Sequence, residues 1–557
     1  MMTLRRQLLT SECRRVAFSR TFPGSRRSGR TLWRVTRISP RSEGTLLRAL
    51  VRERRLTVQE ALDALQQRAE LMNERSYALS DRQLRRWLAG DVASLNGVRP
   101  ANIRVAEAEF GWPIGALLAD DQRPTDHPDS SPEPKDRELR TKEFISWVAE
   151  HSALSYEAAY RAVTEGAEKF ASVSFVMRAA CVDARAQVGR AQIADAVADY
   201  YGHSAAFYSA RVGQRVVRLS VLTNQDWVGL AVPLGGGAES CAPAGRGEGP
   251  AVRLSDSQAR SALDRLAAAE VTGTVMVNNS LYRLSGLEIG RSHLAAQFEC
   301  AEFAVYALTT DLLEAELRDL AREEVQDAEG TATPLRDAWL PTVESGLAFE
   351  RRVCVGGPVC LVAIADGEQY QLLVQERSNQ VLNVTGTLAV IPKAFHQPIV
   401  DAYGETRIST TIERELEEEL FGRVDLEQRS AGSMRRAAPL HPFNASAPMK
   451  WLRGHPDSWR MECTGFGINM VTGNYEFSCL VVIEDPAWWT GYGHLLEANW
   501  EASRLHRYSS LDSDGITHLI GDTRWSNEGL LALIEGLRRL GELDSSRVRL
   551  PAIERIS

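Results

Sequence analysis

The sequence is poor in lysine, in paired cysteines and in long apolar runs. Five Lys stand beside sixty Arg, which together with abundant Ala indicates a high-GC genome such as an actinobacterium's. The eight Cys are scattered without a Cys-x-x-Cys pair, which argues against a zinc ribbon or a disulfide framework and for a reducing cytosol. No apolar run approaches the roughly 20 residues that cross a bilayer, so we expect a cytoplasmic protein with no membrane partner.

The length and the charge distribution indicate several domains with different partners. At 557 residues and 44% hydrophobic content, the chain has enough apolar material for three or four domains. Residues 1–119 contain 22 Arg, no Lys and 11 acidic residues, a net charge of +11. Because the whole chain carries −8, residues 120–557 sum to −19. A basic N-terminal piece on an acidic body is typical of a DNA-binding head on a sensor or enzyme.

Residues 1–44 are rich in Arg and Ser, with two acidic residues, Glu12 and Glu43. Their low, unpatterned apolar content predicts a disordered basic arm. Three alternatives stay open for this segment: an organelle transit peptide, a start codon assigned too far upstream, and an arm that touches DNA.

Residues 45–118 show helical apolar spacing. Ser80 is typical of an N-cap and Gly90 of a C-cap, so we expect a helix over residues 81–89. Leu84, Trp87 and Leu88 would face inward at i, i+3 and i+4. The outward positions are then Arg82, Gln83, Arg85 and Arg86. Such side chains can reach base edges and phosphates in a major groove, although a three-helix bundle with a solvated basic face would show the same pattern.

Residues 79–90 resemble the N-terminal helix-turn-helix modules of actinobacterial XRE-like transcriptional regulators, and Arg99-Pro100 is similar as well. The resemblance implies a DNA-binding domain over residues 45–118, double-stranded DNA as partner and a homodimer. The expected recognition helix is preceded by a long helical segment, residues 58–72. This spacing is looser than the tight turn of a classical helix-turn-helix.

The next two segments are less informative. Residues 119–138 hold four Pro and many acidic residues, which predicts a linker. Residues 139–340 mix helical patterns with expected strands at 216–222 and 228–232, so we expect an α+β domain of unknown role. The glycines at 235–237 are no phosphate loop, because no Gly-Lys-Ser/Thr follows them.

The C-terminal third contains a dense acidic run at residues 415–419. On a helix, Glu415, Glu418 and Glu419 share one face, and like charges that close repel unless a cation neutralises them. Mg²⁺ prefers such carboxylate ligands, although a solvated acidic face is the plainer interpretation. Before the run, residues 359–364 and 370–378 predict a hairpin; after it, residues 466–470 and 475–483 predict another.

Residues 350–525 resemble a Nudix domain, in which a loop and helix hold Mg²⁺ against a diphosphate. The resemblance implies that Arg414 orients Glu415, that Glu415, Glu418 and Glu419 bind Mg²⁺, and that Glu415 and Glu418 are catalytic. It also gives Pro392 and Gly422 structural roles at the site.

The sequence departs from the Nudix pattern in its turns. The usual Pro-Gly-Gly reads Pro392-Lys393-Ala394, the expected box Glu is Thr406, and the closing Gly arrives one residue late as Gly422. Loss of Gly removes close backbone approach to a ligand. A degenerate site of this kind could still bind a nucleotide as a signal.

The sequence thus predicts a multidomain fold: an all-α helix-turn-helix head, an α+β middle domain, an α/β/α Nudix-like domain, and a C-terminal helix and tail over residues 526–557. We expect a DNA-binding transcriptional regulator whose Nudix-like domain senses a nucleotide or phosphate metabolite. The alternatives are a Mg²⁺-dependent Nudix hydrolase of a nucleoside diphosphate-linked substrate and an interaction scaffold.

Overall fold

The computed structural model divides into two compact units, Met1–Lys135 and Asp136–Ser557. It describes residues 45–53, 58–71, 74, 76–89, 99–110, 114–118, 139, 141–172, 188–203, 205–244, 250–272, 274, 276–323, 333–377, 387–399, 401–421, 445–496 and 502–556. The expected arm over residues 1–44 and the expected linker over residues 119–138 lie outside these ranges.

The described part of the first unit consists of helices and short non-helical segments such as residues 76–80. The helices are α1 (Leu46–Glu53), α2 (Val58–Leu71), α3 (Asp81–Ala89), α4 (Pro100–Phe110) and α5 (Ile114–Leu117). Leu47, Leu65 and Trp87 belong to their shared apolar core. The expected all-α helix-turn-helix head is nevertheless not shown, because residues 54–57, 90–98 and 111–113, which would connect the helices, lie outside the described residues.

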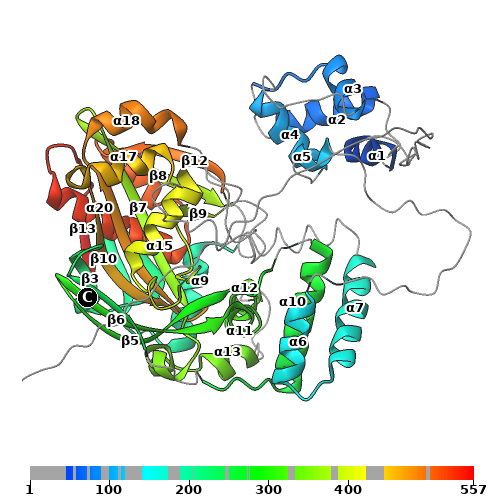
Figure 1. Ribbon diagram of the computed structural model, residues 1–557, viewed down its shortest axis with the longest axis horizontal. Coiled ribbons are helices and arrows are strands. Elements are labelled where there is room, and N and C mark those ends of the chain that lie inside the picture. Colours follow the sequence, from blue (N-terminus) through cyan, green and yellow to red (C-terminus); the bar gives the residue numbers. More distant parts are fainter. Residues whose placement is uncertain are drawn as a thin grey trace, which may run out of the picture. The chain divides into compact units, whose positions relative to one another are not determined.

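In the described part of the second unit, ten strands form one mixed sheet in the order β12-β8-β7-β11-β10-β2-β1-β13, with β9 on β8 and β3 on β10 (Figure 1). The strands are β1 (Phe207–Val212), β2 (Arg215–Leu222), β3 (Val228–Pro233), β7 (Gly356–Asp366), β8 (Gln369–Arg377), β9 (Leu388–Val390), β10 (Trp459–Asn469), β11 (Asn474–Ile483), β12 (Ala502–Ser509) and β13 (Ile553–Ile556). A smaller sheet, β4-β6-β5, comprises β4 (Glu239–Pro243), β5 (Ser280–Gly290) and β6 (His293–Glu302).

Helices surround the two sheets. They are α6 (Lys142–His151), α7 (Tyr156–Ser172), α9 (Arg190–Tyr201), α10 (Asp256–Thr272), α11 (Phe303–Ala307), α12 (Leu312–Glu323), α13 (Pro334–Trp339), α14 (Val343–Leu347), α15 (Ile408–Glu415), α17 (Ala447–Gly454), α18 (Pro486–Tyr492), α19 (Ser513–Ile520) and α20 (Asn527–Leu543). Among the described helices, none has the length and apolar character needed to span a membrane.

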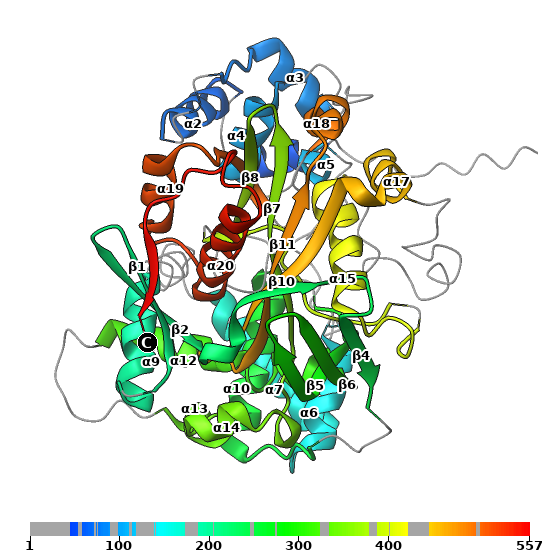
Figure 2. The same cartoon turned by 90° about the vertical axis from the view of Figure 1, so that its left-hand side faces the viewer.

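The two faces of the large sheet bury different helices (Figure 2). Strand side chains alternate between faces, so Cys360 and Val362 of β7 join the cluster of α15, while Leu361 and Ala363 join the cluster of α20. The first cluster also contains Phe298 of β6, so α15 shares its core with both sheets.

The far edge strand of the sheet is β13, which pairs antiparallel with β1. Arg555 of β13 donates from Nε and Nη2 to the buried carboxylate of Glu535 on α20, at 2.9 and 2.7 Å. The same carboxylate accepts from the Tyr208 hydroxyl of β1 at 2.6 Å. A single acidic side chain therefore fixes β1 and β13 to the helix beneath them.

The expected division of the second unit into an α+β middle domain and an α/β/α Nudix-like domain is wrong. Strand β2 of the middle region pairs with β10 at Leu222 and Ile468, and β3 pairs with β10 as well. Strand β13 of the expected tail completes the same sheet. Alternation in sequence predicts that a strand exists, but it does not say which distant strand will share its hydrogen bonds.

Candidate functional site

Helix α15 forms because Ile408, Ile412 and Leu416 present an apolar stripe to the core. Its first turn is capped from another part of the chain. The buried Glu239 of β4 accepts hydrogen bonds from the backbone N–H of Ser409 at 3.0 Å and from its hydroxyl at 2.7 Å. A carboxylate at a helix N-terminus satisfies donors that the helix leaves unpaired.

The acidic run does not continue as a regular α-helix. Residues Leu416–Leu420 form a π-helical turn, in which the N–H of Phe421 bonds to the carbonyl of Leu416 at 3.1 Å. The wider turn changes the rotation between successive side chains. The i, i+3, i+4 spacing expected for Glu415, Glu418 and Glu419 therefore does not bring three carboxylates onto one α-helical face.

Each end of the run instead contacts protein donors. Glu415 accepts from Nε and Nη2 of Arg414 at 3.2 and 3.0 Å, and Arg414 also donates to the Gln397 carbonyl at 3.0 Å. Arg414 thus contacts the carboxylate that the Nudix resemblance would have it orient, and it ties that carboxylate to the loop after β9.

Glu419 is buried and accepts hydrogen bonds from two described residues of the neighbouring loop and strand. The backbone N–H of Lys393 donates at 3.0 Å, and the Gln375 side chain on β8 donates at 3.3 Å. Glu417, between the expected ligands, accepts from the Ser446 N–H at 3.0 Å. These carboxylates hold the loop and strand in place.

The side chains as they stand do not form a ready Mg²⁺ site. No three His, Cys, Asp or Glu side chains in the described ranges are placed to hold a metal ion. Glu418 is buried, at 6% exposure, within the π-helical turn. A cation would have to displace hydrogen bonds that Glu415 and Glu419 already accept, so Mg²⁺ stays a prediction.

The residues expected to shape the site are only partly described. Pro392 follows a cis peptide bond, and its carbonyl accepts from the Cys360 N–H of β7 at 2.9 Å. The loop therefore lies alongside β7 and bonds to its backbone. Gly422 lies outside the described residues.

A buried charged cluster on the α20 face was not predicted from the sequence. The ammonium of Lys393 binds the carboxylate of Glu528 on α20, and that carboxylate also accepts from the Asn469 amide of β10 at 3.1 Å. Glu476 of β11 lies close to both charges. A signal was present: Lys is rare in this chain, and Lys393 stands where the Nudix turn has Gly.

The surroundings shift the pKa values of Glu476 and Glu528 in opposite directions. Burial, followed by the nearby charge of Glu528, raises the pKa of Glu476 to about 8. Burial also disfavours the Glu528 anion, but the Lys393 ammonium outweighs it and holds the pKa of Glu528 below its usual value. At neutral pH the cluster therefore contains one ion pair and one mostly protonated acid.

His396, at the end of the same loop, is fully buried. Its Nδ1 lies 2.7 Å from the Thr411 hydroxyl of α15, and its Nε2 lies 3.0 Å from the Thr406 carbonyl. The rings of Tyr282 and Phe298 flank the imidazole, with centroid-to-centroid distances of 4.4 and 4.8 Å. Burial lowers the pKa of His396 to about 3, so the ring is neutral and joins α15 to the smaller sheet.

The residues expected to contact DNA lie on α3. The Ser80 hydroxyl accepts from the Gln83 N–H at 3.2 Å, which caps the helix. Leu84, Trp87 and Leu88 are buried. The opposite positions are exposed at Arg82, Arg85 and Arg86 and half-buried at Gln83.

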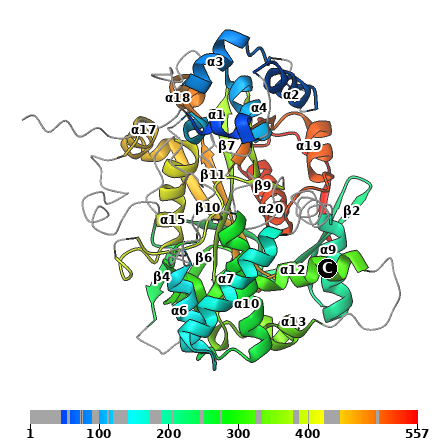
Figure 3. The same ribbon diagram turned by 90° about the vertical axis from the view of Figure 1, so that its right-hand side faces the viewer.

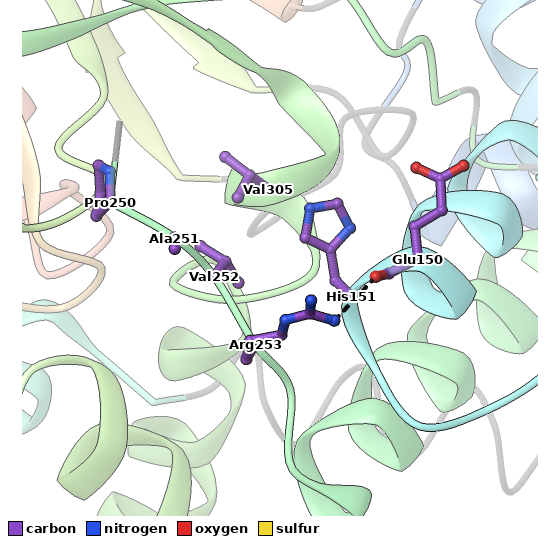
Figure 4. A pocket seen from close by; sticks show the side chains of 7 residues that line it. All are labelled: Glu150, His151, Pro250, Ala251, Val252, Arg253 and Val305. Atoms are coloured by element: carbon purple, nitrogen blue, oxygen red, sulfur yellow. Dashed lines mark hydrogen bonds between the residues drawn. The ribbon is translucent and has the colours of Figure 1, made fainter. Parts of the chain in front are cut away.

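A pocket of about 310 Å³ lies elsewhere in the second unit, and none of the residues predicted for the Nudix site lines it (Figure 4). His151 of α6 and the segment Pro250 to Arg253 form its sides, with Val305 behind. Arg253 donates to the Glu150 carbonyl at 3.3 Å. The volume of this pocket is at the lower end of the range for small-molecule binding sites.

Comparison with known proteins gave no assignment: no family model matches this chain, and no curated protein matches it.

Proposed function

We propose that this protein is a cytoplasmic DNA-binding transcriptional regulator that contacts double-stranded DNA through α3. The observation that supports this is the exposed row Arg82, Arg85 and Arg86 opposite the buried Leu84 and Trp87. Arg side chains suit both phosphate and guanine recognition, and Gln83 adds an amide for adenine.

The charge distribution supports the same proposal. Residues 1–119 carry +11 and the remainder carries −19, so positive charge is concentrated in the part of the sequence that contains α3. A short helix that reads a few base pairs gains specificity when two copies bind adjacent half-sites, so we propose a homodimer as the binding form.

The test is binding of the full-length protein to duplex DNA from upstream of its own gene, followed by fluorescence anisotropy at several salt concentrations. Specific binding that weakens with salt and is lost in Arg82→Ala/Arg86→Ala supports the proposal. Arg104→Ala is the control, because Arg104 of α4 belongs to the same unit but pairs with Glu74 at 2.7 Å. An equal loss in both variants, or no specific binding by the wild type, would overturn it.

A Mg²⁺-dependent hydrolase of a nucleoside diphosphate-linked substrate is the second candidate. The pairing of Arg414 with Glu415 beside the Pro392 loop favours it. Cation-dependent release of phosphate or a nucleoside monophosphate, abolished in Glu418→Gln, would support it. A nucleotide that raises the melting temperature without being hydrolysed would favour a sensing role for the second unit instead.

A further inference from the structure

The hairpin β1–β2 projects beyond β10 in the large sheet, and β13 pairs with β1 as far as Val212 (Figure 2, Figure 3). Val212 and Arg215 pair across a two-residue turn in which Gly213 has φ +58°, a conformation that suits glycine. On its other side, β2 pairs with β10 near its C-terminal end, at Val221 and Leu222. The outer half of β2 therefore extends past β10 as an arm, with β1 and β13 beside it.

The two faces of this arm are different. Tyr208, Ala210 and Val217 point into the core above α20. By alternation, Arg211, Val216 and Arg218 point to the other face. Val216 is 50% exposed and the Arg211 side chain 55%, so this face is open at the tip.

The arm is basic on an otherwise acidic unit. Residues 200–225 contain Arg211, Arg215 and Arg218 and no Asp or Glu, whereas residues 120–557 together carry −19. Within the described ranges Arg211 forms an ion pair with Glu554 of β13, at 3.8 Å with both side chains more than half exposed. Such an exposed, long ion pair offers little to hold the guanidinium against a competing anion.

The third arginine of the hairpin, Arg215, contacts a helix end instead of facing outward. The guanidinium of Arg215 lies on the core-facing side, close to Gly521 at the end of α19. A cation is favoured at a helix C-terminus. The arginines of the outward face are therefore Arg211 and Arg218, which are diagonal neighbours across the hairpin.

We propose that the outward face of the β1–β2 hairpin is a second contact for the phosphate backbone of double-stranded DNA. Arginine side chains on an exposed strand face can approach the phosphate backbone without the strands entering a groove. Side chains at diagonal positions lie about 7–8 Å apart, so Arg211 and Arg218 can engage separate phosphates. The contact reads no bases; it adds affinity to a complex whose specificity comes from α3, and so it rests on the proposed function.

The experiment compares the salt dependence of DNA binding by the full-length wild type and Arg211→Gln/Arg218→Gln, measured from about 50 to 200 mM salt. Each lost phosphate contact lowers the slope of log K against log salt by about 0.9, so we expect a decrease of up to about 2. Affinity should fall equally for specific and unrelated duplexes. The matched control is Arg161→Gln/Arg260→Gln, which removes two exposed arginines of α7 and α10 from the same unit.

The outcomes separate the two proposals. A wild type that binds through α3 while the hairpin variant keeps its full salt slope would overturn the hairpin contact alone. An equal slope change in the control variant would also overturn it, because general charge would then explain the effect. A wild type without DNA binding would overturn both proposals, and stronger competition by single-stranded RNA than by duplex DNA would overturn the assignment to DNA. Unchanged melting temperatures would show that the variants are folded.

Discussion

Glu239 and Ser409 are joined by two hydrogen bonds, from the serine N–H and from its hydroxyl, although they lie on different elements. The contact makes β4 of the middle region supply the N-terminal cap of the acidic helix α15. The helix that carries the candidate site therefore depends on a residue that the sequence pattern places in another domain.

Replacing Glu239 should destabilise the second unit. In Glu239→Ala the N–H and the hydroxyl of Ser409 lose their acceptor in a buried setting, so the free energy of unfolding should fall by about 2–3 kcal/mol. Urea denaturation followed by tryptophan fluorescence measures this. Glu288→Ala, at a side chain 82% exposed, is the control and should change little. Equal midpoints for the two variants would contradict the capping role.

Lys393 and Glu528 should show strong energetic coupling. Lys393→Met leaves the Glu528 carboxylate buried without its cation, which should cost about 3–5 kcal/mol in urea denaturation. In Lys393→Met/Glu528→Gln neither charge of the pair remains, so most of that loss should be recovered. A double variant that loses the sum of the two single effects would show that the residues act independently.

Glu476 should make stability depend on pH. Its pKa is about 8 in the folded protein against 4.5 for an ordinary Glu, so the folded state binds more protons between these values. Its stabilisation is complete below pH 4.5, falls as the pH rises and is lost through pH 8. Each unit of pKa difference corresponds to about 1.4 kcal/mol. Wild type should thus lose stability between about pH 4.5 and pH 8 relative to Glu476→Gln; parallel pH profiles would argue against this assignment.

Mg²⁺ alone should bind weakly. The carboxylates of Glu415 and Glu419 already accept hydrogen bonds from protein donors, and a cation must replace these contacts. We therefore expect no shift of the melting temperature when Mg²⁺ is added. Calorimetric titration is the second measurement, with Glu418→Gln as the comparison. A clear shift in wild type that is absent in Glu418→Gln would favour the hydrolase.

The local sequence was sufficient to predict those elements whose structure depends on one short stretch of residues. The N-cap Ser80 and the stripe of Leu84 and Trp87 predicted α3 with its observed bounds. The two predicted hairpins are present as β7–β8 and β10–β11, and the glycines in their turns, Gly367 and Gly473, have positive φ. Each depends on neighbours within a few residues, which is the range that such patterns cover.

The sequence could not reveal contacts between distant segments. The hydrogen bonds of β2 and β3 with β10 join parts of the chain that carry no shared pattern. The π-helical turn at Leu416–Leu420 was missed because the acidic run fits a regular helix equally well. By its sequence Lys393 is only a departure from a loop pattern, whereas in the structure its side chain pairs with Glu528 of α20.

The position of β13 has a consequence for how the protein is made. Until Ile553 to Ile556 have been synthesised, the outer edge of β1 presents unpaired N–H and C=O groups, and Glu535 lacks its contact with Arg555. Nascent chains on the ribosome therefore pass through a long period with an exposed strand edge that can pair with other chains. We therefore expect chaperone dependence during synthesis and aggregation of chains that are released early, because the strand that covers the edge of β1 follows the other described strands of the sheet along the chain.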